Sequence, residues 1–246
     1  MNRVELGFLS LTGTAPSGRD AEYLAWHALD HMPEQYALPG MLNGQRWRST
    51  GPCRDQRAVG VAGYDVVDNV VCYLMGAPAR ETLDRFVALG RTLADKGRYP
   101  EVVPSRLVGA FELLDAHAAA RVLVSPEVVP WRPNLGIYLI VEELTDRAAA
   151  APFLRWAHTD GVPSLLSCPG VAGVWWFGTA ARFAQPMFSK GEFRVTVCYL
   201  DADPATVGAA LAPIVRERWR HDGVEARLAA PFESVVRWDW ERFFRP

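Results

Sequence analysis

Two histidines four residues apart, His27 and His31, are the side chains of this sequence best suited to chemistry. An imidazole can take up or release a proton near neutral pH, for example at a carbon next to a carbonyl group. Residues four apart lie on one face of a helix, so a helix here would hold both rings together. Asp30 adjoins His31 and is a third candidate, although neighbouring helical side chains point apart. We predict His31, His27 and Asp30 as catalytic residues, with His31 first.

The helix that carries these residues is predicted to begin at Ser17 or Asp20 and to end near Met32, because Pro33 follows. At such a helix end the dipole favours the protonated imidazole of His31, whereas partial burial would oppose it. We therefore expect a pKa near neutrality for His31. The alternative is structural, since a histidine at this place could simply cap the last carbonyl groups of its helix.

Two histidines at this spacing could also bind a metal ion, but the sequence offers no third ligand and no HExxH motif around them. The four cysteines are far apart and never form a Cys-x-x-Cys pair, which argues against a zinc ribbon and a disulfide framework. Phosphate-loop, dinucleotide and Gly-x-Ser-x-Gly motifs are also missing. The sequence therefore predicts neither a metal site nor a cofactor.

Five further residues are candidates for holding a substrate. Arg46 and Tyr73 could bind a carboxylate or an enolate, the arginine through its two-pronged guanidinium group, although surface positions on strands would explain both equally well. Trp26 is either a core residue or a stacking surface. Glu112 lies in an apolar stretch, where a carboxylate must face outward or sit in a polar pocket with a raised pKa. With Trp47, these residues form the predicted substrate-binding set.

The stretch that carries the histidines returns later in the chain in a weaker form. Residues 24–40, LAWHALDHMPEQYALPG, and residues 154–170, LRWAHTDGVPSLLSCPG, agree at six of seventeen ungapped positions. The second copy has an alanine where His27 stands, and Gly161 lies opposite His31. This pattern predicts a duplicated domain in which only the first half kept the imidazoles.

Hydrophobic periodicity and turn residues predict the order β-α-β-β-α-β in each half. Gly161 is expected to end its helix in a left-handed conformation. Residues 106–114 are predicted as the fourth strand of the first half, although their leucine content leaves a helical interpretation open. The remaining predicted elements are strands at 5–12, 41–50, 66–75, 135–142, 171–179, 192–200 and 226–236, and helices at 80–96, from Thr145 or Asp146, and at 205–219.

Further shared residues support the duplication and set its boundaries. The tripeptide Cys72-Tyr73-Leu74 returns as residues 198–200, and Phe111-Glu112 returns as residues 232–233. The predicted units are residues 1–115, a proline-rich linker at 116–133, and residues 134–246, of which the last ten have no counterpart and are expected to pack as a tail.

Composition bounds the class of protein. Half of the 246 residues are hydrophobic and 11% are aromatic, which is enough for a full core and argues against disorder. The formal net charge is −2 and acidic and basic residues are interspersed, which argues against a nucleic-acid partner and an anionic membrane. No uncharged apolar run approaches 18 residues. We expect a cytoplasmic protein that binds a small hydrophobic molecule, and self-association into a homo-oligomer is left open.

The pattern Trp-x-x-x-Asp-His-x-Pro-Glu followed by Leu-Pro-Gly, from Trp26 to Gly40, resembles the EthD-like members of the dimeric α+β barrel superfamily. The resemblance implies an α+β fold in which two ferredoxin-like βαββαβ units, here fused, pack their antiparallel sheets into one barrel. That superfamily includes cofactor-free monooxygenases, muconolactone isomerase, polyketide cyclases and haem enzymes such as chlorite dismutase, which share a pocket between sheet and helices. The second half departs from the pattern at Gly161, so a site built around the histidine would exist once per chain.

The preferred function is therefore a cofactor-independent enzyme, of isomerase, cyclase or lyase type or a monooxygenase, that transfers a proton on a small hydrophobic carbonyl or polyketide-like compound. One alternative is a haem enzyme of chlorite dismutase-like tandem architecture, with His158 or His31 as the axial ligand. Another is a non-catalytic small-molecule-binding protein.

Overall fold

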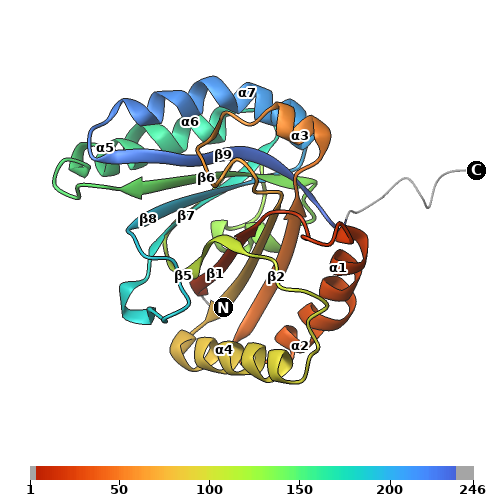
Figure 1. Ribbon diagram of the computed structural model, residues 1–246. Helices are drawn as coiled ribbons and strands as arrows, with labels where there is room; N and C mark the ends of the chain where they lie inside the picture. The colour runs from red at the N-terminus through yellow and green to blue at the C-terminus, as the bar shows by residue number, and fades with distance from the viewer. Residues whose placement is uncertain (1–3, 237–246) are drawn as a thin grey trace, which may run out of the picture.

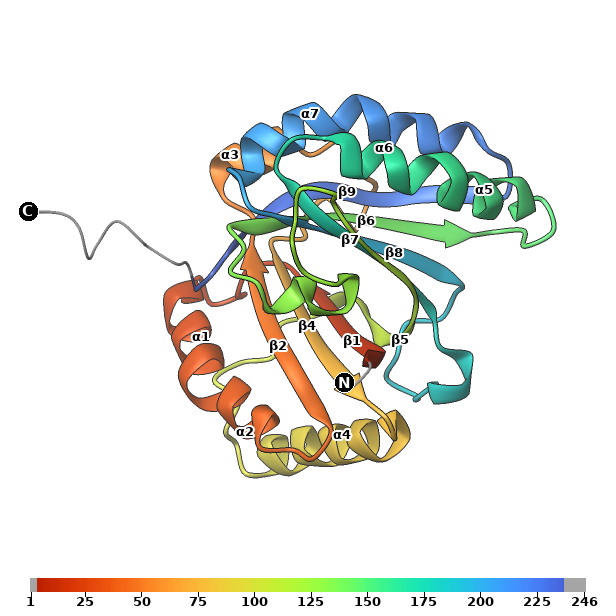
Figure 2. The same ribbon diagram turned by 180° about the vertical axis from the view of Figure 1, so that it is seen from behind.

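A closed antiparallel barrel of eight strands forms the centre of the computed structural model, which describes residues 4–236 (Figures 1 and 2). The strands follow one another around the barrel in the order β2-β4-β1-β5-β7-β8-β6-β9, and pairing of β2 with β9 closes it. The short β3, Val59–Gly60, pairs with β9. The barrel strands are β1 Val4–Thr12, β2 Met41–Arg48, β4 Asn69–Gly76, β5 Ser105–Ala118, β6 Gly136–Leu144, β7 Val171–Thr179, β8 Phe193–Leu200 and β9 Val224–Ser234.

Helices cover the outside of the barrel, one group over each half (Figures 1 and 2). The first group is α1 Asp20–Trp26, the π-helical turn η1 His27–His31, α2 Met32–Tyr36 and α4 Ala79–Asp95. The second is α5 Ala151–Trp156, the π-helical turn η3 Ala157–Gly161, α6 Val162–Ser167 and α7 Pro204–Glu217. Shorter segments are α3 Gly51–Asp55, η2 Pro126–Trp131, η4 Ala181–Phe183 and η5 Arg218–Arg220.

Side chains on every strand alternate between the barrel interior and the helices, as a period of two requires. The interior is filled by apolar side chains from both halves, including Trp47, Trp175 and Phe232, which are nearly or fully buried. The face toward the helices of the first half carries a separate cluster around Leu6 and Tyr73. This layer between sheet and helices is the one that positions the candidate site.

Both halves arrange their four long strands in the same way. Counted within its own half, the fourth strand lies beside the first, the first beside the third, and the third beside the second. Gly40 and Gly170 precede the second strand of each half with φ angles of +86° and +91°, a conformation that favours glycine. The π-helical turns η1 and η3 also occupy equivalent places.

The predicted end of the first helix at Met32 is wrong, because the helical chain continues to Tyr36. In the π-helical turn the backbone N–H of Met32 donates to the carbonyl oxygen of His27, five residues earlier. Pro33 then falls in the first turn of α2, where a residue without an N–H group is tolerated. Gly161 likewise lies inside its helix, with a φ of −63°, and does not end it.

The match of Cys72-Tyr73-Leu74 with residues 198–200 is out of register by one residue. Tyr73 lies opposite Phe8 and faces the helices, whereas Tyr199 lies opposite Ile137 and faces the barrel interior. A shift of one residue along a strand moves a side chain to the other face, so identical letters here occupy different environments.

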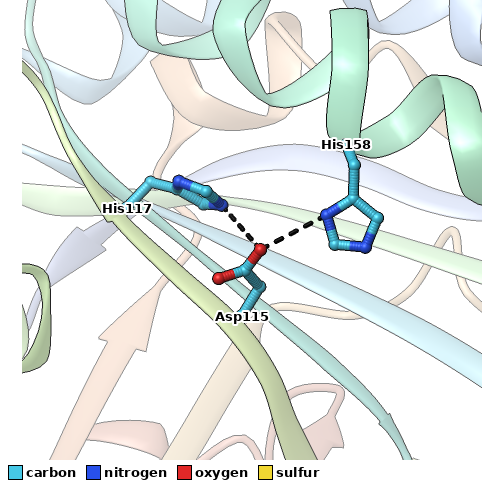
Figure 3. A group of neighbouring side chains, drawn as sticks. All are labelled: Asp115, His117 and His158. Atoms are coloured by element: carbon cyan, nitrogen blue, oxygen red, sulfur yellow. Dashed lines mark ion pairs between the residues drawn. The ribbon is translucent and has the colours of Figure 1, made fainter.

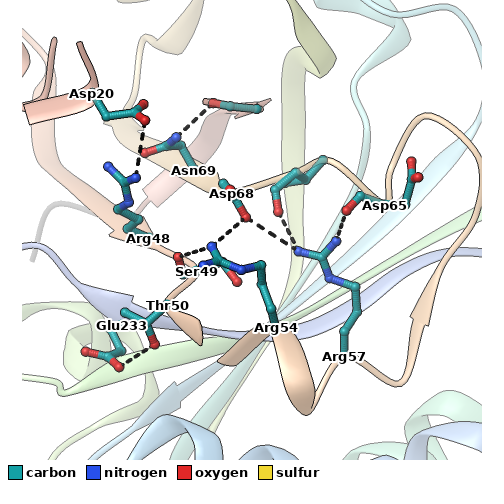
Figure 4. A network of polar contacts seen from close by, with 12 residues as sticks. Asp20, Arg48, Ser49, Thr50, Arg54, Arg57, Asp65, Asp68, Asn69 and Glu233 are labelled. Atoms are coloured by element: carbon teal, nitrogen blue, oxygen red, sulfur yellow. Dashed lines mark hydrogen bonds and ion pairs between the residues drawn. The ribbon is translucent and has the colours of Figure 1, made fainter. Parts of the chain in front are cut away.

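Several element boundaries also differ from prediction. β5 is a strand, not a helix, and it continues to Ala118, beyond the boundary expected at residue 115. Residues 51–65, for which no helix or strand was predicted, contain α3 and β3, and a polar network holds this stretch against the barrel (Figure 4). Within it, Arg54 donates to the carbonyl of Ser49 at 3.1 Å and Thr50 donates to Glu233 at 2.7 Å. The predicted tail, residues 237–246, lies outside the described residues.

None of the helices among residues 4–236 has the length and apolar character needed to cross a membrane.

Candidate active site

A cavity of about 540 Å³ lies between the sheet of the first half and its helices. β1 contributes Phe8, η1 contributes both histidines, and α4 contributes Phe86 and Val87. The walls are mostly apolar and aromatic. Part of the lining is a connected group of polar and aromatic residues, namely Tyr23, Trp26, His27, His31, Gln35, Arg46, Tyr73 and Tyr99. Ser10, Thr12, Arg91, Glu101 and Ser105 are further polar residues of the lining.

His27 and His31 both face this cavity from the π-helical turn, with ring centroids 5.4 Å apart. Their residues are 5% and 9% exposed. Burial, and after it the nearby Arg46 guanidinium, lower the pKa of His27 to about 2. Burial likewise lowers the pKa of His31 to about 4, with Glu34 opposing this shift and Arg46 adding to it. Both imidazoles are therefore neutral at pH 7, and the predicted near-neutral pKa of His31 is wrong because His31 is buried.

The ring of His31 is held between aromatic and amide neighbours. It stacks on Trp26 with centroids 5.0 Å apart and also contacts Tyr99 at 5.3 Å. Its Nε2 atom lies 3.4 Å from Nε2 of Gln35, and its Nδ1 atom is buried with no hydrogen-bond partner. Rotating the Gln35 amide by half a turn would bring Oε1 to this place, where it can accept a hydrogen bond from Nε2–H. Nδ1 is then the free proton acceptor of the ring.

Arg46 brings a buried positive charge to the same cavity. Its Nη2 atom donates to Oδ1 of Asn69 at 3.0 Å, and Asn69 in turn donates to the carbonyl of Gly13 at 2.9 Å. The guanidinium carbon lies 5.1 Å from the centre of the Tyr23 ring. Burial lowers the pKa of Arg46 from its ordinary value of 12.5, but an arginine stays protonated at neutral pH.

Five buried polar atoms without a hydrogen-bond partner belong to residues that line this cavity. They are Nδ1 of His27 and of His31, Nε of Arg46, the hydroxyl of Tyr73 and, before the half-turn of its amide that pairs it with His31, Oε1 of Gln35. Burial raises the pKa of Tyr73, so its hydroxyl is a neutral donor. A buried polar atom left unpaired costs about 1–3 kcal/mol, so a ligand that pairs with several of them would bind with a large gain.

Three predicted site residues lie elsewhere. Asp30 is exposed on the far side of its turn and does not line the cavity. Trp47 is inside the barrel and donates from Nε1 to Asn134 at 3.1 Å, beside a smaller cavity of about 370 Å³. Glu112 accepts from Arg182 on the outer surface.

Some lining residues were missed by the sequence analysis. Gln35 follows His31 by four residues, so helical spacing could have found it if the helix had been continued past Pro33. Tyr23 and Asn69 hold Arg46, but no spacing rule links them to it. Tyr99 comes from the segment after α4 and carries no signal in the sequence.

The equivalent space in the second half is filled. A Cβ atom added to Gly161, opposite His31, would lie 3.0 Å from the Trp156 ring and 3.2 Å from Nη1 of Arg218. Arg218 is 1% exposed, and its Nε and Nη2 donate to the two carboxylate oxygens of Glu142 at 2.9 and 3.0 Å. β7 is the equivalent of β2, and Trp176 of β7 stands at the position of Arg46, 130 residues later in the chain. Among residues 4–236, the candidate site therefore occurs in the first of the two halves alone.

Neither predicted haem ligand is placed to hold a haem. An axial imidazole needs open space for the macrocycle beside its ligating nitrogen. The ring of His31 is covered by Trp26, and its Nε2 is turned to Gln35. His158 lines neither of the two cavities, and its ring packs edge-on against Trp176 at 4.7 Å. As placed here, neither His31 nor His158 fits an axial ligand of haem.

Solved structures share this fold. A chlorite dismutase from Candidatus Nitrospira defluvii superposes with a TM-score of 0.54 at 12% identity, covering 95% of this chain and 92% of its own. An anthrone oxidase-like protein gives 0.52 at 11%, covering 94% and 92%. A protein assigned as a monooxygenase from Fusobacterium nucleatum gives 0.51 at 10%, covering 98% and 99%. At these identities the likeness establishes the α+β barrel fold and not an activity.

No protein-family model matches the sequence, and no curated protein matches it either.

Proposed function

We propose that this protein is a cofactor-independent enzyme that transfers a proton on a small hydrophobic carbonyl compound of aromatic or polyketide-like character. The observation that carries the proposal is the group of unpaired buried atoms on residues that line a mostly apolar cavity. Aromatic walls suit a flat, apolar substrate body, and the unpaired polar atoms suit a carbonyl oxygen and the acidic carbon beside it. A pocket of about 540 Å³ is within the range for small-molecule sites.

In the proposed reaction, the substrate carbonyl oxygen lies between Nε of Arg46 and the hydroxyl of Tyr73, which both donate to it. Nδ1 of His31 removes a proton from the adjacent carbon, and the electron pair of that C–H bond forms a carbon–carbon double bond. The carbonyl π pair moves to oxygen, giving an enolate that Arg46 stabilises. Return of the same proton to another carbon completes an isomerisation, whereas departure of a β-substituent completes an elimination.

The low pKa of free His31 does not prevent this role. The imidazolium forms at the same moment as the enolate, so the two charges stabilise each other in a site of low dielectric. Gln35 would accept from Nε2–H and so keep Nδ1 free. His27, with its lower pKa of about 2, is the less basic of the two rings and would serve as a neutral partner on the other side of the substrate.

An oxygenase reaction is the second candidate, because proteins of the same fold include an anthrone oxidase-like protein and an assigned monooxygenase. The enolate of the first step is electron-rich, and molecular oxygen would be the co-reactant that oxidises it. The two candidates therefore share His31 and Arg46 and differ in the step after enolate formation. A non-catalytic binding protein would use the cavity without any proton transfer.

The test uses 2-tetralone, a flat ketone whose acidic methylene group adjoins the carbonyl, and anthrone, whose methylene group is conjugated with the carbonyl across the central ring, in deuterated buffer without oxygen. Wild-type protein is expected to accelerate exchange of the methylene protons, followed by NMR, and His31→Ala is expected to lose this acceleration. Admitting oxygen then separates the candidates, since consumption of oxygen with product formation supports the oxygenase. Binding of anthrone and related ketones without exchange or turnover would overturn the enzymatic proposal in favour of a binding protein.

We also propose that the chain arose by fusion of two ferredoxin-like units and that it is EthD-like in its first half. The shared strand order, the two π-helical turns and the two positive-φ glycines support this. The second unit then kept the scaffold, with Arg218 and Glu142 in place of the site.

A further inference from the structure

A second group of chemically competent side chains lies outside the cavity, where β5 approaches the π-helical turn η3. Asp115 and His117 come from β5 and His158 from η3, and the three side chains point toward one another (Figure 3). Oδ2 of Asp115 is 2.9 Å from Nε2 of His117 and 3.3 Å from Nδ1 of His158. One ligand atom from each residue lies within 4.8 Å of the other two.

An irregularity in β5 brings two of these residues to the outer face. Phe111 and Leu113 pack against the barrel interior, and Ala116 and Ala118 do so further along the same strand. The pairing with β7 shifts between Leu113 and Asp115, as in a β-bulge, so the inward positions change from odd to even numbers. Asp115 and His117 consequently face outward, toward the helix that carries His158.

The contacts within the group resemble those of metal ligands more than those of a hydrogen-bonded cluster. Nε2 of His117 is buried and has no hydrogen-bond partner, although it lies within ion-pair distance of Asp115. Two donors bound to one tetrahedral zinc ion at about 2.0–2.1 Å are themselves about 3.3 Å apart. The separation of 3.3 Å between Nδ1 of His158 and the shared carboxylate oxygen matches this value, and that of 2.9 Å from Nε2 of His117 is 0.4 Å shorter.

The surroundings of Asp115 also suit a cation. Among the described residues, its ion-pair partners are the two imidazoles and no lysine or arginine. Its Oδ1 atom accepts from the backbone N–H of Ala116 at 2.9 Å, which orients the carboxylate with Oδ2 toward the histidines. The ring of His158 packs edge-on against Trp176, and this contact fixes its direction. The three side chains are between 35% and 47% exposed, so an ion can reach them from solvent.

We propose that Asp115, His117 and His158 bind a divalent transition-metal ion, for which Zn²⁺ is the expected occupant. Two imidazoles and one carboxylate are ligands that zinc accepts, and three protein ligands leave a position for water. The bound ion would join β5 to η3 on the second half of the barrel. This site departs from the expectation of a metal-free protein and does not depend on the proposed function of the cavity.

The test uses untagged protein, since a polyhistidine tag would itself bind the ion, after treatment with a chelator and dialysis. Titration with Zn²⁺ by calorimetry is expected to show one site, and Co²⁺ is expected to give the visible absorption of a low-coordinate complex. His117→Ala, His158→Ala and Asp115→Asn should each weaken binding more than tenfold, at least the size of effect seen when only an outer partner of a ligand is removed. His221→Ala is the matched control, because His221 packs on Trp156 and lies outside the group.

Each outcome decides the question. Loss of binding in the three variants with retention in His221→Ala supports the site, provided that circular dichroism shows all four variants folded. Equal binding by wild type and all variants, or no binding of either ion by wild type at millimolar concentration, would overturn the proposal. Loss of binding in His31→Ala with retention in His158→Ala would also overturn it, because the ion would then lie in the cavity.

Discussion

The imidazole of His31 lies nearly parallel to the indole of Trp26, with ring centroids 5.0 Å apart and planes inclined by 23°. In the second half, the equivalent Trp156 instead carries the Arg218 guanidinium, 5.8 Å from its ring centre. The two equivalent tryptophans therefore have different partners. Trp26 packs on a neutral ring beside an open cavity, and Trp156 packs on a buried ion pair. Substitutions in the first half should therefore affect chemistry, and those in the second half should affect stability.

Replacing His31 should separate catalysis from folding. His31→Ala is expected to lower turnover by about 100-fold or more, the range of a lost general base. The free energy of unfolding should change by less than about 2 kcal/mol, because the cost of lost packing is offset by removal of an unpaired buried atom. Steady-state kinetics and urea denaturation measure the two effects.

Asp30→Ala is the matched control in the same helical turn, because Asp30 is exposed. It should change neither turnover nor stability by a measurable amount. If the two variants lose activity equally, or if His31→Ala alone fails to fold, His31 has a structural task and the proposed base is wrong.

Removing the buried guanidinium should weaken enolate stabilisation and change a histidine pKa. Arg46→Met is expected to lower kcat, and the pKa of His31 should rise from about 4 because one nearby positive charge is gone. NMR titration of the histidine ring protons measures this shift. Arg48→Met is the control, because Arg48 lies on the same strand as Arg46 and forms a partly exposed ion pair with Asp20 of α1. It should leave the pKa of His31 unchanged. An unchanged pKa in Arg46→Met would show that the guanidinium and imidazole are not neighbours in solution.

The two buried histidines should make the protein lose stability in mild acid. Their folded pKa values, about 2 and about 4, lie below the ordinary value of 6.5. The unfolded chain therefore takes up protons that the folded chain refuses, so stability is complete above pH 6.5 and falls as pH decreases. For each histidine the slope approaches about 1.4 kcal/mol per pH unit.

The histidine contribution can be isolated by comparing wild type with the double variant His27→Gln, His31→Gln between pH 6.5 and 5. Most carboxylates titrate below this range, and the other histidines are common to both proteins, so their effects cancel. The unfolding free energy of the variant should be less dependent on pH. Parallel curves would show that neither ring is kept neutral by the fold.

The buried ion pair of the second half should be costly to break singly. Arg218→Met leaves the carboxylate of Glu142 fully buried without its main partner, and a loss of about 3–5 kcal/mol is expected. The double variant with Glu142→Leu should recover most of this loss. Arg220→Met, at an exposed pair with Glu217, is the control and should cost under about 1 kcal/mol. A double variant no more stable than the single one would show that the pair stabilises the fold outright.

Much of the fold could be predicted because strand and helix periods are visible in an apolar sequence. Residues 171–179 were predicted as a strand with its observed bounds, and the helix at 80–96 is displaced by one residue. The π-helical turn was not predictable. A proline such as Pro33 can follow a helix that ends, or can lie in the first turn of a helical segment that continues, and the sequence does not distinguish the two. That one error hid Gln35 and gave His31 the wrong surroundings.

The site could be predicted only where its residues are close in sequence. His27 and His31 were found from helical spacing, whereas Tyr99 reaches the cavity, and Asn69 reaches Arg46, through the fold alone. The bulge in β5 leaves no trace in residue types. The predicted strand ended at Leu114, so the sequence did not predict that Asp115 and His117 continue the strand and face outward.

The barrel joins its halves along two unequal seams. β5 and β7 pair from Phe111–Thr179 to Ala118–Gly173, whereas β2 and β9 share, among the described residues, only the pairs Trp47–Ser234 and Arg48–Glu233. Local opening of the barrel should therefore begin between β2 and β9, while β5 and β7 stay paired. β9 is also the last barrel strand to be synthesised. Until it emerges from the ribosome, the edge of β2 in the first half has no strand to pair with. Because β9 pairs with only two residues of that edge in the described part of the finished barrel, the intermediate exposes little more of it than the folded protein does.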